Sequence, residues 1–404
     1  MPNSILTIDM ITRKSLEILE NNLVVTRNVN RQHDDSFAVQ GAKIGTTLRI
    51  RLPDRALVTD GAALQVQDDN EQYTTLTVSS QKHIGVNFTT AELTMSLDDF
   101  AERVLKPRVS QLAASVDATV VSNSQTGFFA SVGTPGTTPS TSLVLLQATQ
   151  KLNEYAAPMG ERYCTVNPAA NAGLVEGLKG LFNPTSTISK QFKTGLMAEG
   201  ILGYDEFAMS QSIGNFTTGS RDATASTTVS TTITAQGATT VVLGQGSVTT
   251  TIKAGDVFTI GNVYAVNPQT RLSTGSLQQF VATADATGVS GTFTVSVSPA
   301  IYTSSNALAT VDSFPQANAV VTFLGTASTA YPQNLVYHKD AIAFATADLV
   351  MPTGVDMASR QVHNGISLRL VRQYDINNDR LPTRLDVLFG SSVIRPQLGV
   401  RLWG

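Results

Sequence analysis

The first 36 residues carry apolar side chains near helical spacing. Ile8, Ile11, Leu16 and Leu19 recur on one side of a helical projection. The stretch RNVNRQHDD that follows is polar, which suits a solvated or partner-bound segment. We therefore expect residues 1–43 to form an N-terminal arm that contains a helix.

The period changes in residues 44–95. In TLRIRLPDRALV, apolar side chains alternate with Arg49 and Arg51, and YTTLTVSS and IGVNF show the same two-residue alternation. A long polar segment separates the first two runs. The pattern predicts an extended two-stranded loop, which cannot bury much surface by itself and needs a neighbour.

A long helix is predicted over residues 97–123. Ser96 and Asp99 have the spacing of a capping box, and a broad apolar stripe runs from Phe100 to Val120. Pro107 is expected to bend or split this helix. A linker rich in Gly, Ser, Thr and Pro follows, so residues 96–140 form a separate segment.

Helix and strand then alternate in residues 141–217, where Asn167 and Pro168 form an N-cap followed by proline at the first helical position. Composition changes near Thr218. Residues 218–333 are rich in Thr, poor in charge and full of short alternating runs, which predicts an inserted all-β barrel or sandwich. The mixed pattern returns in residues 334–404, which end in three expected strands.

Length and charge narrow the classes of protein. A chain of 404 residues predicts more than one domain. The net charge of −3, without a basic run, argues against a nucleic-acid reader built on a cationic stripe. The single cysteine, Cys164, rules out an intrachain disulfide framework. No apolar run is long enough to span a membrane, and the N-terminus lacks the basic region of a secretory signal, so we expect cytosolic synthesis and no membrane partner.

The motifs of common catalytic and cofactor sites are absent from the sequence. It contains no Gly-x-Ser-x-Gly elbow, no phosphate-binding loop and no Gly-x-Gly-x-x-Gly. The four histidines are scattered along the chain. We therefore expect no catalytic residue, no metal site, no cofactor and no enzymatic activity.

One stretch has the ligand spacing of a calcium-binding loop. DINNDRLPTRLD, residues 375–386, has acids or amides at the first, third, fifth and twelfth positions. However, Arg380 stands where such a loop needs glycine, Pro382 stiffens the backbone, and the flanks alternate as strands. We interpret it as a strand–turn–strand in which Asp375 and the asparagines form the turn.

Several motifs, in their order along the chain, resemble one protein family. They are RIRLP, QKHIGVNFT and MSLDDFAERVLKP in the first 107 residues, RYCTVNPAANAGL at 162–174, KAGDVFTIGNVYAVN in the insertion, and GISLRLVRQYDINNDRLPTRLDVLFGSSVIRPQLGVRL at the C-terminus. In this order they resemble the coat proteins of P-twenty-two-type short-tailed phages, a branch of the tailed-phage major capsid proteins.

This resemblance implies an α+β, Hong-Kong-97-type capsid fold. Its parts would be an N-terminal arm, an extended loop, a peripheral domain with a spine helix, an axial α/β domain and an inserted all-β barrel-like domain. It implies an icosahedral head shell of hexamers and pentamers, assembled in the host cytoplasm as a procapsid that matures. The implied partners are a scaffolding protein, a portal protein and packaged double-stranded DNA, which is contacted non-specifically.

A shell subunit needs many modest contacts that close by symmetry. Charged residues beside the loop and in the C-terminal strand pair are our candidates for them: Arg49, Arg51, Asp54, Arg55, Asp375, Asp379, Arg384 and Asp386. Each could instead be a solvated side chain or fix its own turn. Two other classes stay open at this point. A Thr-rich surface adhesin or binding module would need an export signal, and an α/β enzyme would need a catalytic motif.

Overall fold

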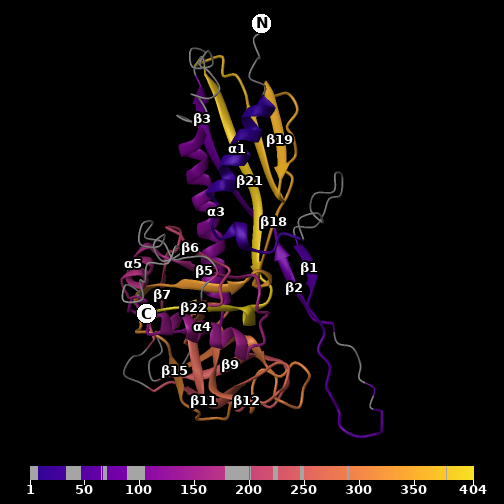
Figure 1. Ribbon diagram of the computed structural model, residues 1–404, viewed down its shortest axis with the longest axis vertical. Coiled ribbons are helices and arrows are strands. Elements are labelled where there is room, and N and C mark those ends of the chain that lie inside the picture. Colours follow the sequence, from indigo (N-terminus) through magenta and orange to yellow (C-terminus); the bar gives the residue numbers. More distant parts are fainter. Residues whose placement is uncertain are drawn as a thin grey trace. The chain divides into compact units, whose positions relative to one another are not determined.

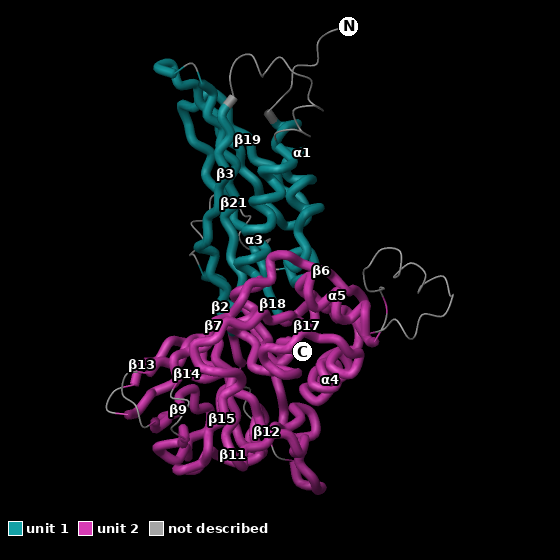
Figure 2. Tube along the Cα trace, turned by 90° about the vertical axis from the view of Figure 1, so that its left-hand side faces the viewer, with its two compact units in different colours: residues 1–50, 74–120, 342–392 teal, residues 51–73, 121–341, 393–404 magenta. Residues whose placement is uncertain are grey.

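The computed structural model describes residues 8–32, 47–64, 66, 71–88, 105–177, 200, 202–221, 226–245, 250–288, 291–378 and 380–404. The chain forms two compact units (Figure 2). Unit 1 contains residues 1–50, 74–120 and 342–392, and unit 2 contains residues 51–73, 121–341 and 393–404. The predicted N-cap at Ser96 and the first residues of the predicted long helix lie outside the described residues.

Unit 1 is built around an antiparallel sheet whose long strand is β21 (Figure 1). Leu385, Val387 and Phe389 of this strand are fully buried, which confirms the alternation seen in the sequence. One result differs from the sequence-based picture. The run IGVNF was assigned to the two-stranded loop, but only β1 and β2 pair there, whereas β3 runs antiparallel along β21. The strands are β1 (Thr47–Arg51), β2 (Tyr73–Thr77), β3 (Ser80–Phe88), β18 (Ile342–Thr346), β19 (Met357–His363), β20 (Ile366–Arg372) and β21 (Leu381–Val393).

The N-terminal helix α1 (Ile8–Asn22) packs on β19 and β20 of the same unit. Leu16 and Leu19 are buried, as their spacing predicts. The polar stretch after the helix was expected to be solvated or bound to a partner; Arg27 and Gln32 are exposed, but the residues between Arg27 and Arg31 are buried within unit 1. Asn28 and Asn30 are buried, η1 (Thr26–Asn28) makes a tight turn, and Asn30 bridges to Ala343 of β18.

Asp117 holds this turn. Its carboxylate is 1% exposed and accepts hydrogen bonds from the backbone amides of Val24 (2.6 Å), Val25 (3.3 Å) and Thr26 (3.0 Å), and from the Thr26 hydroxyl. Bonds to an ionised acceptor are about twice as strong as neutral ones. One acid on the apolar face of the long helix therefore satisfies three backbone donors of the N-terminal segment.

Asp117→Asn is expected to destabilise unit 1 by about 1.5–3 kcal/mol, because the amide loses the charge and turns a donor toward backbone N–H groups. Native-state amide exchange of residues 24–26 measures this loss. Thr26→Ser is the matched control, since it keeps both the hydroxyl and the carboxylate. Equal exchange rates in the Asp117→Asn variant and the wild type would contradict the assignment.

The described part of the long helix is α3 (Lys106–Gly127). Its predicted apolar stripe is buried, and it ends four residues later than expected. Pro107 lies near the start of the described helix, and the residues before Leu105, where the expected bend or split would show, lie outside the described residues. The buried residues of the stripe are Val109, Leu112, Ala113, Val116 and Val120.

Unit 2 contains a mixed five-stranded sheet in the order β4-β22-β17-β5-β6. The helix α4 (Ser142–Glu154) packs against β22 and β4. The predicted N-cap is confirmed: the Asn167 side chain accepts a hydrogen bond of 2.7 Å from the Ala170 amide, at the start of α5 (Pro168–Gly177). The strands are β4 (Ala130–Val132), β5 (Arg162–Val166), β6 (Glu206–Met209), β17 (Asn334–His338) and β22 (Gly399–Leu402), and short 3₁₀ turns are η6 (Lys339–Ala341) and η7 (Pro396–Leu398).

The Thr-rich insertion forms a six-stranded antiparallel sheet in the order β15-β11-β12-β14-β9-β8. Its edges meet: the Val321 amide donates to the Thr227 carbonyl (2.8 Å) and the Val229 amide to the Ala319 carbonyl (2.9 Å). This closure gives the expected barrel. Its strands are β8 (Thr228–Val229), β9 (Ala238–Gly244), β11 (Val257–Val266), β12 (Ser273–Ala282), β14 (Thr292–Ile301) and β15 (Val321–Phe323), with the short pair β10 (Thr251–Ile252) and β13 (Ala286–Thr287). Near the end of the insertion, β16 (Ala330–Pro332) pairs with β7 (Asn215–Thr217), which lies just before the insertion.

The barrel is filled by aromatic and branched side chains, among them Phe258, Phe280 and Phe293. Polar side chains join it to the five-stranded sheet. Gln279 exchanges two hydrogen bonds with the backbone of Ser131 (2.7 and 2.9 Å). No helix of the described residues is long and apolar enough to cross a membrane. The α+β architecture with its inserted barrel therefore agrees with the expected fold class.

Candidate inter-subunit surfaces

The base of the loop carries exposed charges. Arg49 and Arg51 lie on β1, and both are exposed. Arg51 pairs with Glu71 at 3.1 Å, but the two side chains are 78% and 58% exposed. Such a pair contributes about 0–1 kcal/mol to folding. Its charges therefore remain accessible to another molecule at little cost to the subunit.

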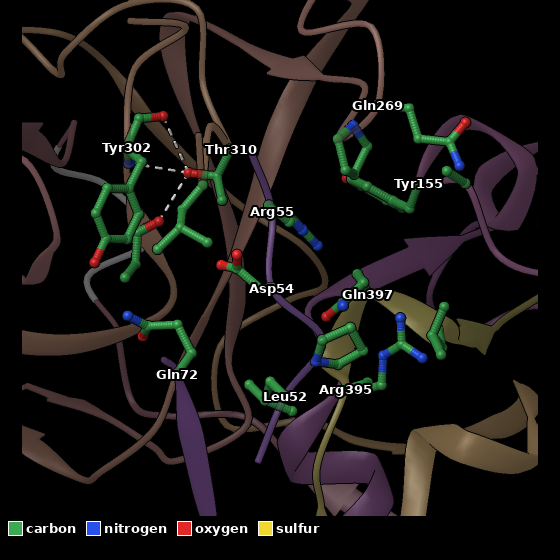
Figure 3. A pocket seen from close by; sticks show the side chains of 16 residues that line it. Leu52, Asp54, Arg55, Gln72, Tyr155, Gln269, Tyr302, Thr310, Arg395 and Gln397 are labelled. Carbon is green, nitrogen blue, oxygen red and sulfur yellow. Dashed lines mark hydrogen bonds between the residues drawn. The ribbon is translucent and has the colours of Figure 1, made fainter. Parts of the chain in front are cut away.

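Asp54 and Arg55 follow β1 directly and line a cavity in unit 2 (Figure 3). Asp54 is exposed, whereas Arg55 is half-buried. Across the cavity lies Arg395, which follows β21 near the C-terminus. Sequence reasoning missed Arg395, because 340 positions separate it from Arg55 and only the fold brings the two together.

The C-terminal turn is a strand–turn–strand, as its asparagines predict. The Asp375 carboxylate accepts hydrogen bonds from the Asn377 backbone amide (3.0 Å) and the Asn378 side chain (2.8 Å). The backbones of Asp375 and Arg380 pair in an isolated antiparallel β-bridge. The bond from Asn378 is the main cause that lowers the pKa of Asp375. Among the described residues, no group of three or more His, Cys, Asp or Glu side chains is placed to hold a metal ion. Asp379 lies outside the described residues.

Calcium is therefore expected to have no effect on this turn. Adding a chelator or millimolar calcium should leave the thermal unfolding of the wild type unchanged, and Asp375→Ala should not alter that insensitivity. The carboxylate of Asp375 already accepts two hydrogen bonds within the turn, and no group of further acids among the described residues is placed to share an ion with it. A calcium-dependent shift that Asp375→Ala removes would restore the calcium-loop interpretation.

Asp386 lies on β21 and is completely buried. It accepts hydrogen bonds from Arg369 (2.8 Å) on β20, Arg384 (2.6 Å) on its own strand and Gln81 (3.3 Å) on β3. Burial alone would raise the pKa of Asp386, but the hydrogen bonds from Arg369 and Arg384 outweigh burial and lower it. Asp386 therefore fixes the strand pair from within and has no surface of its own to offer a neighbour.

The exposed member of this cluster is Arg384. A depression of about 610 Å³ places Arg384 beside Asp375, Arg380 and Arg108. Arg108 is held there by a hydrogen bond of 2.9 Å to the Gly85 carbonyl. Of the described candidates, Arg51, Asp54 and Arg55 thus lie in unit 2, whereas Arg49, Asp375, Arg384 and Asp386 lie in unit 1.

Comparison with known proteins identifies the family. A family model described as "P22 coat protein - gene protein 5" matches residues 3–404. The chain belongs to the P22 coat protein family. It is a major capsid protein, which self-assembles into the icosahedral head shell of a bacteriophage and is located in the virion capsid. This assignment sets aside the adhesin interpretation.

Solved structures similar to the coat protein come from other phages. The structure of Mycobacterium phage Che8 has 12% sequence identity, covers 94% of this chain and 90% of that chain, and gives a TM-score of 0.48. The capsid of cyanophage P-SCSP1u has 11% identity over 91% and 86% of the two chains, with a TM-score of 0.42. The CUS-3 coat protein I-domain has 27% identity and covers 26% of this chain and 100% of its own, with a TM-score of 0.20. A search of curated proteins finds no match.

Proposed function

We propose that the coat protein contacts its neighbours in the shell through the loop of residues 52–72 and through the C-terminal strand pair. One observation carries this proposal. Three large aliphatic side chains of the loop are almost fully exposed in the isolated chain: Val58 at 80%, Leu64 at 90% and Val66 at 84%. Burying each against another molecule would contribute about 1.5–3 kcal/mol.

The charges around these side chains support the same surface. Arg49, Arg51 and Asp54 are exposed at the loop base, and Arg384 and Asp375 share the depression at the C-terminal pair. Complementary charges set register and suppress wrong pairings more than they add affinity. Aliphatic burial with a charged rim is the composition expected of a specific interface.

We further infer that assembly begins with a procapsid in the host cytoplasm, uses a scaffolding protein and a portal protein, and ends in maturation around double-stranded DNA. The family supports these steps. With a net charge of −3, the coat protein should meet DNA only through non-specific contacts. Its role is structural, so we expect it to act without catalysis.

Amide exchange of free subunits and assembled shells tests the proposed contacts. Amides of residues 54–64 and 380–384 are expected to exchange at least tenfold more slowly in shells. The interior strand β9, protected in both states, and the exposed turn at 231–236 serve as references. Equal exchange of residues 54–64 in subunits and shells would refute the role of the loop.

A further inference from the structure

The cavity at the loop base is lined by several segments that are distant in sequence, among them three that carry the argument. Residues 52–55 of the loop, the barrel near Tyr302 and the C-terminal segment at Arg395 and Gln397 enclose about 390 Å³ (Figure 3). Arg55 and Gln397 also line a smaller cavity of about 50 Å³ beside Tyr155 and Gln278. All of these residues belong to unit 2.

Two guanidinium groups face this cavity, and no carboxylate of the described residues forms an ion pair with either of them. Figure 3 shows Arg55 and Arg395 reaching in from different segments, with Gln397 between them. No hydrogen bond or ion pair joins either guanidinium to a residue that the structure describes, and the buried Nε of Arg395 has no acceptor there. Burial, and then the charge of Arg395, lower the pKa of Arg55. Their proximity is therefore unfavourable in the isolated subunit.

Two carboxylates lie near the cavity, but neither neutralises the arginines by contact. Asp54 turns its carboxylate toward the Tyr302 side, away from Arg55 (Figure 3). Asp340 opposes the effect of burial on the pKa of Arg395 but does not line the cavity. The space between the two arginines thus lacks the acceptor that a pair of buried cations requires.

The shape and lining of the cavity restrict what can fill it. Its walls include Leu52, Leu308 and Leu398, and its other donors are neutral amides and hydroxyls such as those of Gln397 and Tyr302. This space suits one planar acidic group with a short aliphatic stem, which two arginines bind through paired hydrogen bonds. A shell brings many copies of this chain together, and each copy has 31 acidic residues against 28 Lys and Arg. Acids are therefore available from neighbours.

We propose that this cavity receives an aspartate or glutamate side chain of a second copy of the coat protein, held between Arg55 and Arg395. This contact rests on the assembly of subunits into a shell and names one site of it. The guanidiniums repel each other in the free subunit and become an anion clamp in the shell. The same side chains therefore have opposite effects on the two states.

Arg55→Gln and Arg395→Gln test this opposition. Each substitution is expected to leave the urea midpoint of the free subunit unchanged or higher, as followed by the fluorescence of Trp403, the only tryptophan, which lies in unit 2. Subunit association into shells should weaken at least tenfold. Lys253→Gln removes the same charge from an exposed position of the barrel and should leave both properties unchanged. Normal association of both arginine variants would overturn the proposal.

Arg55→Lys allows the bound acid to be located. In shells assembled without DNA, a carbodiimide should join the new amine to a carboxylate of a neighbouring chain, forming an amide with loss of water. Mass spectrometry should find this interchain peptide in shells and not in free subunits. A bond within one chain only, or none, would overturn the proposal. If the wild type and Lys253→Gln also fail to form shells, the shell function itself is contradicted along with the clamp.

Discussion

Leu64→Asp is expected to abolish shell assembly while leaving the subunit folded. Leu64 is 90% exposed, so the substitution removes no packing from the free chain, and its unfolding free energy should change by no more than about 0.5 kcal/mol. In a shell, the contact would lose the apolar burial of Leu64 and would have to desolvate a carboxylate. Because a shell repeats each contact many times, even a modest loss per subunit multiplies over the particle.

Electron microscopy and sedimentation of the variant give the result. Folded subunits without closed particles are expected, and circular dichroism should match the wild type. Leu64→Met is the matched control, because it keeps the length and the apolar surface, and it should assemble normally. Closed particles from Leu64→Asp at wild-type yield would show that this part of the loop does not lie in a contact.

Local pattern predicted the elements of this fold well. The two-residue alternation around Leu385 and Phe389 identifies a strand with one buried face, and the structure buries both side chains. The Asn167–Pro168 pair identifies a helix start, and the Asn167 cap is present. The loss of charge and the dense alternation after Thr218 identify the barrel. In each case the signal lies within a few residues of the element that it predicts.

Partners that are distant in sequence could not be predicted in this way. The alternation in β3 shows that it is a strand, but it does not show that the strand pairs with β21, some 300 residues later. The polar residues Asn28 and Asn30 do not look buried in the sequence, but Asp117 holds the nearby Thr26 and Asn30 bridges to Ala343 of β18, which places this turn inside unit 1. Arg395 gave no signal at all, since its significance comes from Arg55 across a cavity.

The surroundings of Asp386, one of the candidate residues, likewise depend on a partner that the local sequence pattern does not reveal. The sequence made Asp386 a candidate for an inter-subunit contact or for fixing its own turn, and the structure buries its carboxylate between two arginines of the same unit. Register explains this: Asp386 lies directly opposite Arg369 on β20, a pairing that depends on how the two strands align. Cross-strand partners of this kind interact most strongly when they face each other.

Asp386→Ala is expected to destabilise unit 1 by about 3–5 kcal/mol. Removing one partner of a buried ion pair leaves the other charge without compensation, and the Arg369 side chain is only 16% exposed. Arg384 is 47% exposed and can turn to solvent, so most of the cost falls on Arg369. Native-state amide exchange of β20 and β21 measures the loss in this unit. Asp375→Ala, which removes a half-buried acid of the neighbouring turn, is the matched control and should cost much less.

The dependence of the unfolding free energy on acidic pH provides an independent check on the ion pairs of Asp386. The pKa of Asp386 is lowered from 3.8 in the folded state, so its stabilising effect is complete above the unfolded-state value and is lost as pH falls through the folded-state value. The stability difference between the wild type and Asp386→Asn should therefore be constant at pH 5–7 and shrink only below about pH 4. If the difference already disappeared near pH 6, or did not change down to the acid unfolding of the chain, the carboxylate would not be the ionised centre of this cluster.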